Sequence, residues 1–491
     1  MSHKTVPLSI SILAGGIAGL LGGLLFWVAV GILFTPIVHI VLSIILGIIF
    51  AIVLGPKLQT GGASLVWGEA YGLAWWFAGY LTLVPLVSGD GLYWLPEQII
   101  ALFPLLLGQV IAFGAALGLS YYGLVKICLR IFPSSASPTQ SHPTDSRPRG
   151  QEIITPRLQS VVFGAVGGFL GGWVFLLGIQ NAAFFSLVSG ILGSDSFGLG
   201  RTLHFTIAIT IGVTFGLLFH RDVKNSGPAI VWGMAYGISW WMIGPMTLRP
   251  LFSGSLPDWT LAGAQATFTP LISHILYGAI MGLFYALATK LWNTLFVDSD
   301  PLNRTRESAG SKSLKGLLMG QVAGIVGGLL FTTVMVATNS LPRVASLVGG
   351  NTAVLGFVVH LLIAFVIGST YGIFFQNAAY SYGAGMGWGL VYGMLWWLLG
   401  PGTFFFILLR QPVDWSLAAT TARYPALVGH LLYGMGLGLT FQYLIRRYDT
   451  HTESQKGLPH VHQTSGTPAS ALWAVTLLLG VLLPLILGTA S

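Results

Sequence analysis

Stretches of about 20 apolar residues, long enough for a helix to cross the hydrocarbon core of a membrane, recur along this chain between short polar segments. In the middle of the sequence they lie near 157–180, 202–220, 227–252 and 268–292, and four counterparts lie on either side. A thirteenth stretch, within 470–491, has no counterpart elsewhere in the chain. The pattern predicts an all-α polytopic membrane protein with about 13 spans.

One motif is written three times at matching places in this pattern. It reads WGEAYGLAWW at 67–76, WGMAYGISWW at 232–241 and WGLVYGMLWW at 388–397. Repetition on this scale predicts tandem structural units. Because each unit has an even number of spans, successive units enter the membrane from the same side as parallel repeats. We place the repeats and the segments that join them as follows: repeats at 1–131, 156–296 and 313–447, polar linkers at 132–155, 297–312 and 448–469, and an extra transmembrane helix at 470–491.

Composition agrees with the pattern, and charge gives an orientation. Of the 491 residues, 54% are hydrophobic and 7% are charged, which excludes an ordinary soluble globular protein. Cytoplasmic segments of membrane proteins carry an excess of Lys and Arg, so we expect the N-terminus and the linkers in the cytoplasm and the C-terminus outside. The basic residues gather at helix ends and linkers instead of forming a continuous face, and no nucleic-acid partner is expected. Only five of the 22 Lys and Arg residues fall on the predicted outer side: Arg201, Arg249, Arg343, Arg410 and Arg423.

Each third span ends in a glycine that is followed three residues later by a threonine, at Thr82, Thr247 and Thr403. In the second and third repeats proline follows the glycine, and we expect the helix to break there. Broken backbone at membrane depth must line protein or a water-filled cavity. The three threonines are therefore candidate cavity residues. Three charged residues of the outer side could also rim such a cavity, or anchor their loops at the lipid headgroups: Arg249, Asp258 and Asp414.

Histidines provide the clearest candidate chemistry. Five of the 11 histidines occupy two repeated positions, near the start of the second span and in the outer part of the fourth span. The second-span position is taken by His39, His204 and His360, and the fourth-span position by His274 and His430. In the first repeat the corresponding fourth-span position is Gln109. An ionisable residue inside a membrane bundle is a candidate functional site.

Three interpretations of these residues stay open. A neutral histidine can bridge two helices by a hydrogen bond, which is a packing role. The pairs His204 with His274 and His360 with His430 could instead bind a cofactor, because bis-imidazole ligation of haem, or a shared metal, needs facing helices of this kind. Contact with a solute or a proton is the third interpretation, and it includes His39 and Gln109. We expect no cofactor, with haem or a pigment as the alternative.

Other features narrow the function. Glu69 is the only carboxylate in a predicted span, and we expect it to reach toward the interface, as long side chains near helix ends do. The sequence contains no P-loop, Rossmann fingerprint, HExxH motif or GxSxG elbow, so no enzyme class is predicted.

The segment that begins at His39, the tryptophan motif and the GHLLYG sequence at 429–434 resemble the four-span YagU-type bacterial inner-membrane proteins. The resemblance covers each repeat once and implies a bacterial cytoplasmic membrane. We expect a permease- or channel-like protein for a small or apolar solute, since the spans hold no charged pairs for a strongly ionic one. The alternatives are a redox protein that binds haem or pigment through histidine, and a scaffold subunit that docks a partner through 470–491.

Overall fold

The computed structural model describes residues 6–31, 35–131, 154–179, 183–223, 225–296, 309–376, 378, 381–456 and 469–488. Within these ranges the chain is helical apart from short connections, and it contains no strand. Ten of the described helical stretches are long and apolar enough to cross a membrane. The prediction of an all-helical, polytopic membrane protein is confirmed at this level. Most of the predicted linkers lie outside the described residues, at 132–153, 297–308 and 457–468.

In the described part of the first predicted repeat the elements are α1 Leu8–Val30, α2 Pro36–Leu54, the 3-10 turn η1 Gly55–Lys57, α3 Gly61–Trp75, the π-segment η2 Trp76–Leu83, α4 Val84–Ser88, α5 Pro96–Ala101, α6 Phe103–Leu107, the π-segment η3 Gly108–Ala115 and α7 Ala116–Ile131. The second contains α8 Ile154–Phe175, η4 Leu176–Gly178, α9 Ala183–Ser189, η5 Gly190–Leu192, α10 Phe197–Phe219, α11 Ser226–Ile243, the π-segment η6 Gly244–Leu248, α12 Arg249–Phe252, α13 Leu261–Ala266 and α14 Phe268–Phe296.

The third predicted repeat and the C-terminal segment also consist of α-helices, with π-helical segments continuing some of them. They contain α15 Ala309–Ala337, α16 Leu341–Ala345, η8 Ser346–Val348, α17 Ala353–Phe375, α18 Tyr382–Leu399, the π-segment η9 Gly400–Phe404, α19 Phe405–Leu408, α20 Leu417–Ala422, α21 Tyr424–Lys456, α22 Ala469–Leu477, the π-segment η10 Leu478–Leu482 and α23 Leu483–Leu487.

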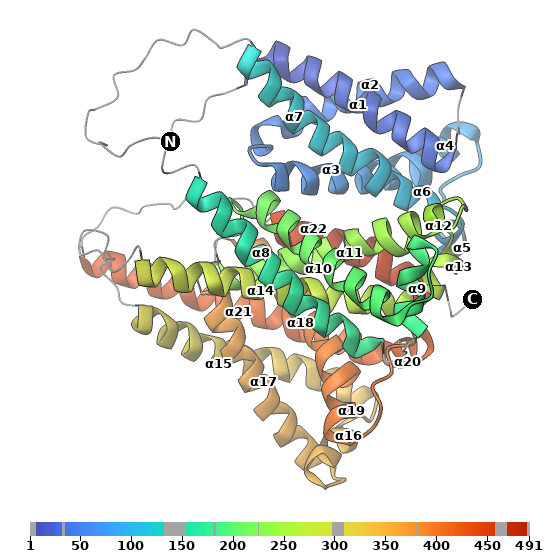
Figure 1. The fold of residues 1–491 in the computed structure, drawn as a ribbon. Helices are drawn as coiled ribbons and strands as arrows, with labels where there is room; N and C mark the ends of the chain where they lie inside the picture. The colour runs from blue at the N-terminus through green and yellow to red at the C-terminus, as the bar shows by residue number, and fades with distance from the viewer. Residues whose placement is uncertain are drawn as a thin grey trace. The chain divides into compact units, whose positions relative to one another are not determined.

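The chain forms two compact units. The first comprises Met1–Phe169, Phe185–Asp222 and Ser239–Ala264, and the second comprises Leu170–Phe184, Val223–Ile238 and Gln265–Ser491. In the first unit α1 packs against α2 and α7, and α3 packs against α7 and η3 (Figure 1). In the second unit α15 packs against α17 and α21, and α18 packs against α21. The first and third predicted repeats therefore pair their helices in the same order.

Glycines lie where these helices cross. A Cβ atom on Gly19 of α1 would overlap the backbone of α2 at Gly47, and one on Gly324 of α15 would overlap the backbone of α17 at Gly368. Lipid removes the hydrophobic driving force between helices, so association depends on backbones that can approach closely. The glycine stripes of the sequence are thus packing surfaces.

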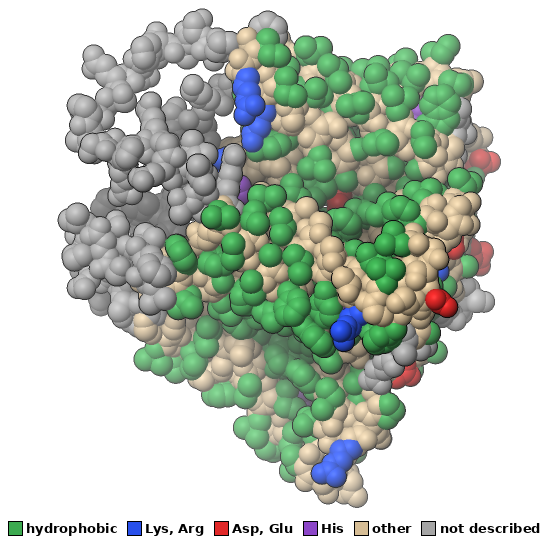
Figure 2. Space-filling view, in the orientation of Figure 1, with side chains coloured by type: hydrophobic (Ala, Val, Ile, Leu, Met, Phe, Trp, Pro, Cys, Tyr) green, Lys and Arg blue, Asp and Glu red, His purple; other side chains and the backbone are tan. Residues whose placement is uncertain are grey.

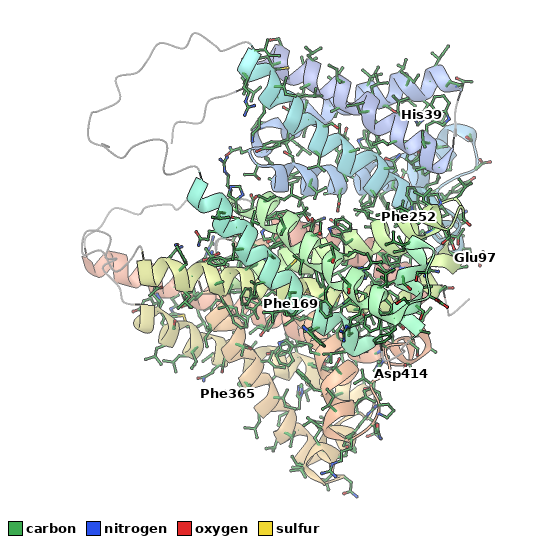
Figure 3. All side chains as sticks on the ribbon, in the orientation of Figure 1. His39, Glu97, Phe169, Phe252, Phe365 and Asp414 are labelled. Carbon is green, nitrogen blue, oxygen red and sulfur yellow. The ribbon has the colours of Figure 1, made fainter. Side chains whose placement is uncertain are left out.

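Apolar side chains also cover the outer faces of the helices (Figure 2). On α17, for example, Val358, Leu362 and Val366 are exposed on successive turns, and Phe365, labelled in Figure 3, is exposed beside them. A soluble protein rarely exposes contiguous apolar surface of this extent. The faces are suited to contact with lipid tails.

Two expectations about single elements are wrong. The third spans of the second and third repeats are not broken at the Gly-Pro pair, because a π-helical segment, η6 or η9, continues the helix through it. In the third repeat one long helix runs over Tyr382–Leu408. Glu69 does not reach toward the interface, since it is 1% exposed and accepts a hydrogen bond from Ser239 Oγ at 3.2 Å. Glu69 lies on the inward face of α3, where its carboxylate is hydrogen-bonded within the protein and shielded from water.

The C-terminal helix is part of the protein's own interior. Trp473 on α22 and Leu485 on α23 are both fully buried, and within the second unit α22 packs against α18 and α23 against α20. The Trp388 indole of α18 donates to Ser470 Oγ at 3.1 Å. A helix buried in this way offers little surface to a partner subunit.

Candidate functional site

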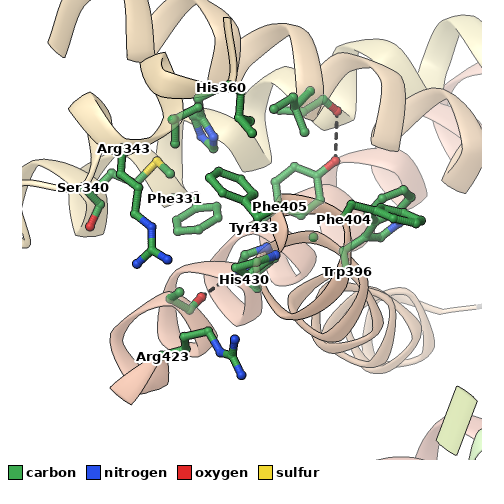
Figure 4. Close-up of a pocket in the computed structure, with 18 of the residues that line it drawn as sticks. Phe331, Ser340, Arg343, His360, Trp396, Phe404, Phe405, Arg423, His430 and Tyr433 are labelled. Atoms are coloured by element: carbon green, nitrogen blue, oxygen red, sulfur yellow. Dashed lines mark hydrogen bonds between the residues drawn. The ribbon is translucent and has the colours of Figure 1, made fainter. Parts of the chain in front are cut away.

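A cavity of about 460 Å³ lies inside the second unit, among the helices of the third predicted repeat. Its walls come from α15, α17, α21 and the continuous segment formed by α18, η9 and α19 (Figure 4). The lining is mainly aromatic and aliphatic, with Phe331, Trp396, Phe404 and Phe405 among its larger members. Cavities of this size and character are typical of small-molecule sites, which measure about 300–1,000 Å³.

His430, on α21, presents a nitrogen atom to this cavity. Its Nδ1 donates to the carbonyl of Ala426 one turn earlier, at 2.7 Å, and because a carbonyl can only accept, Nδ1 carries the proton. In the neutral ring Nε2 is then a hydrogen-bond acceptor. A Cβ atom on Gly400 would lie 3.9 Å from Nε2, so the missing side chain of η9 leaves that nitrogen accessible from the cavity.

His360, on α17, is held differently. Its Nε2 donates to the carbonyl of Gly328 on α15 at 3.0 Å, and His39 makes the matching bond to Gly23 at 2.9 Å in the first unit. Both second-span histidines therefore tie the second helix of a repeat to the first. This is the packing role that a neutral histidine can play between two helices.

Phe331 separates the two histidines of the cavity. Its ring centroid lies 5.1 Å from that of His360 and 4.6 Å from that of His430, and Figure 4 shows it between them. With an aromatic ring in between and His360 Nε2 engaged by a carbonyl, the pair does not fit bis-imidazole ligation of a haem iron or one shared metal. Among the described residues, no group of three or more His, Cys, Asp or Glu could hold a metal ion.

In the second predicted repeat, the two candidate histidines belong to different compact units. His204 is buried in the first unit, where its ring contacts Phe185 and Phe205. His274, in the second unit, donates from Nδ1 to the carbonyl of Pro270 at 2.7 Å and contacts the ring of Phe175. The fourth-span histidines thus share one conformation, which fixes the proton on Nδ1.

The first predicted repeat places Gln109 where the third has His430. Gln109 is buried in η3, and its amide nitrogen donates to the Tyr80 hydroxyl at 3.1 Å. The Tyr80 ring stacks on Phe26, which in turn stacks on His39. Tyr80 stands at the sequence position of Pro401, directly after the glycine of the π-segment. A phenol ring therefore lies where the third repeat has only a pyrrolidine.

The three candidate threonines are structural. In each π-segment the threonine hydroxyl donates to the carbonyl five residues earlier, at 2.9 Å for Thr82, 2.8 Å for Thr247 and 2.8 Å for Thr403. The hydroxyl also accepts an indole N–H from the outer loop, 12 residues later in the chain. The donors are Trp94, Trp259 and Trp415. A π-segment leaves carbonyls poorly satisfied, and this pairing both satisfies them and fixes the loop.

The charged outer-loop candidates are Asp258, Asp414 and Arg249. Asp258 is exposed and accepts from the hydroxyl of Thr260 at 2.6 Å, at the start of α13. Asp414 accepts from Ser416 N–H at 2.8 Å before α20 (Figure 3), and this bond is the main reason that the pKa of Asp414 is lowered. Arg249 is an exposed residue at the start of α12. The two aspartates act at helix starts.

Two arginines of the predicted outer side line the cavity, although their positions in the sequence indicate only a role in orientation. They are Arg343 on α16 and Arg423 directly before α21. Phe331 was also missed as a site residue. Its signal is present in the sequence, because Phe26, Phe175 and Phe331 recur at the same place in the three repeats.

No protein-family model, curated protein or solved structure matches this chain. The chemistry of the cavity must therefore be argued from its own geometry. That geometry is an apolar, aromatic chamber with one imidazole acceptor inside and two guanidinium groups in its lining.

Proposed function

We propose that this protein is a permease-like membrane protein that takes up a small solute with an apolar body into the cavity of its third repeat. The observation that carries the proposal is the cavity itself, which measures about 460 Å³ and is lined by Phe331, Trp396 and Phe404. Chambers that are mostly apolar and contain a few placed polar groups are the usual form of a ligand site. Nε2 of His430 supplies one such group.

The π-segment η9 supports this assignment. It carries Gly400, Pro401 and Phe404 into the cavity wall, and π-segments inside helices are frequent at functional sites. A chamber walled by such a segment can change shape when the helix shifts its hydrogen-bond register. That property suits a solute that must both enter and leave.

The proposal includes the architecture and the location. Three parallel four-span repeats are supported by the matching helix pairs and by the threonine–tryptophan pair that occurs three times. The excess of Lys and Arg on the predicted inner side favours a cytoplasmic N-terminus, and the resemblance to YagU-type proteins favours a bacterial inner membrane. Two residues of the predicted outer side, Arg343 and Arg423, then line the cavity.

The test is ligand binding by the whole protein in lipid nanodiscs. Neutral apolar solutes from benzene to dodecanol would be screened by their effect on the unfolding temperature, because a ligand that binds only the folded state raises it. We expect at least one to do so. Gly400→Phe should remove the shift, since its ring would enter the cavity beside His430. Solute counterflow in proteoliposomes would then separate a carrier from a protein that only binds.

Leu362→Phe is the control, because it places the same benzyl group on the exposed face of α17 and should leave the shift unchanged. Equal shifts in the native protein and in Gly400→Phe would mean that the solutes act elsewhere, and the proposed site would be wrong.

A further inference from the structure

We propose that the solute of this cavity is an anionic amphiphile, with a carboxylate or phosphate head between Arg343 and Arg423 and an apolar chain among the aromatic residues. This inference rests on the proposed function and names its substrate class. Three features of the cavity support it: two arginines in its lining, the partners that those arginines already have, and the distance from Arg423 to His430.

The first observation is that two cations converge on one chamber. Arg343 and Arg423 both line the cavity. Burial is the main reason that the pKa of Arg423 is lowered, while the charge of Asp414 raises it and the charge of Arg343 lowers it. Two guanidinium groups held near one another repel. An anion between them would remove the repulsion and accept charge-assisted hydrogen bonds from both.

The second observation concerns the acidic group nearby. Arg423 donates to the backbone carbonyl of Asp414, while the Asp414 carboxylate accepts from the backbone of Ser416 at 2.8 Å. The carboxylate attracts Arg423 at a distance but makes no hydrogen bond to it among the described residues. The guanidinium of Arg423 also lies over the ring of Phe406, 5.2 Å from its centroid. The N–H groups that are not bound to Asp414 therefore remain at its edge for an anion.

The third observation is the distance from head to chain. Arg423 precedes His430 by seven residues, so the two lie about 10 Å apart along the helix axis. Figure 4 shows Arg343 on one side of the cavity, and Trp396 and Phe404 on the opposite side. A ligand that satisfies both ends needs a charged head and an extended apolar body.

The other repeats lack this pair of charges. Thr267 and Leu102 stand at the positions equivalent to Arg423, and Leu187 stands at the position equivalent to Arg343 in the second repeat. The anion site therefore belongs to the third repeat alone. This restriction separates it from the features that all three repeats share.

The experiment uses photo-crosslinking of the whole protein in phosphatidylcholine nanodiscs. Three probes carry a diazirine at the end of a 12-carbon chain: a carboxylate, an alcohol of the same length, and a phosphatidate. Labelled peptides would be mapped by mass spectrometry. We expect the anionic probes to label the peptides that contain Phe331 or Phe404, and we expect unlabelled dodecanoate to compete.

The variants decide the role of charge. A charge-assisted hydrogen bond contributes about 1.5–3 kcal/mol, so the double variant R343Q/R423Q should bind the carboxylate at least about tenfold more weakly, and R343K/R423K should recover part of the loss. R249Q, which changes an exposed arginine outside the cavity, should have no effect. Size-exclusion profiles would confirm that each variant is folded.

The outcomes separate this inference from the proposed function. Equal labelling by alcohol and carboxylate, unchanged in R343Q/R423Q, would overturn the anionic head and leave an apolar solute. Failure of every probe to label the cavity would overturn both proposals. Labelling by the phosphatidate alone, or by the carboxylate alone, would support the anionic head and show whether it comes from a membrane lipid or from a free single-chain acid.

Discussion

The first and third repeats have different side chains at two equivalent positions, and these side chains make different contacts. In the third repeat Pro401 and His430 face an open chamber. In the first repeat the same two positions hold Tyr80 and Gln109, which are hydrogen-bonded to each other. The surroundings correspond at the glycine of the π-segment and at the second-span histidine that binds the first helix. The two repeats thus differ in whether these positions are hydrogen-bonded to each other or line a cavity.

The difference suggests how a repeated membrane protein can specialise. Helix pairing depends on the glycine contacts and on the threonine–tryptophan pair, which occur in more than one repeat and fix the scaffold. The positions that line the interior are free to vary once the scaffold is stable. On this view one repeat holds the ligand and another contributes stability.

The largest effect on ligand binding should come from placing the Tyr80–Gln109 pair of the first repeat at the equivalent positions of the third repeat. We expect P401Y/H430Q to fill the chamber with a phenol ring that is hydrogen-bonded to an amide, and to abolish ligand binding while the protein stays folded. Ligand-induced shifts in unfolding temperature in nanodiscs would measure this. H430Q alone removes the imidazole without adding the ring and should weaken binding only in part. Full binding by the double variant would show that the two sites are not equivalent.

Opening the first repeat should affect stability. Y80A removes an aromatic ring that stacks on Phe26 and leaves the amide of Gln109 without its hydroxyl partner. Removing a large aromatic side chain from a core costs about 3–5 kcal/mol, and we expect the lower end of that range because Tyr80 is only half-buried. Denaturation in mixed micelles is the measurement. Y80F, which keeps the ring, should lose about 1 kcal/mol; equal losses in both variants would mean that the ring itself contributes little.

The sequence predicts the fold far better than the site. Span lengths, the repeated motif and the glycine stripes depend on local composition, and the helical membrane architecture follows from them. The site depends on contacts between helices, which no spacing reveals. His360 and His430 have the right separation for a shared ligand, yet Phe331 from a third helix lies between them. The helix break predicted from glycine and proline was wrong for a related reason, since a tryptophan 12 residues away stabilises a π-segment instead.

Removing the indole N–H of a threonine–tryptophan pair should have a smaller effect on stability, and two of the pairs can be compared because they differ in burial. Trp415 is 3% exposed and Trp94 is 51% exposed, although both donate to the threonine of a π-segment. Loss of a buried hydrogen bond costs about 1–3 kcal/mol because the remaining partner is left unsatisfied, whereas water can replace an exposed one. We therefore expect W415F to lower the free energy of unfolding by at least about 1 kcal/mol more than W94F. Similar losses at both sites would show that ring packing, not the N–H group, anchors the loops.

The smallest effect is on the stability of the protein at low pH, and it depends on Asp414 of the third repeat. The pKa of Asp414 lies below its usual range, chiefly because its carboxylate accepts from the backbone of Ser416 and also because Arg423 is near. A carboxyl group whose pKa is lower in the folded state stabilises the fold at neutral pH, and this contribution is lost as the pH falls through the folded pKa. We expect the unfolding temperature of D414N to depend less on pH below about 4 than that of the native protein, with D258N as the control. If an anionic ligand sits between Arg343 and Arg423, D414N should also bind it slightly more tightly at neutral pH, because a competing negative charge beside Arg423 is gone. A D414N protein with an unchanged acid limb and weaker ligand binding would contradict both parts of this argument.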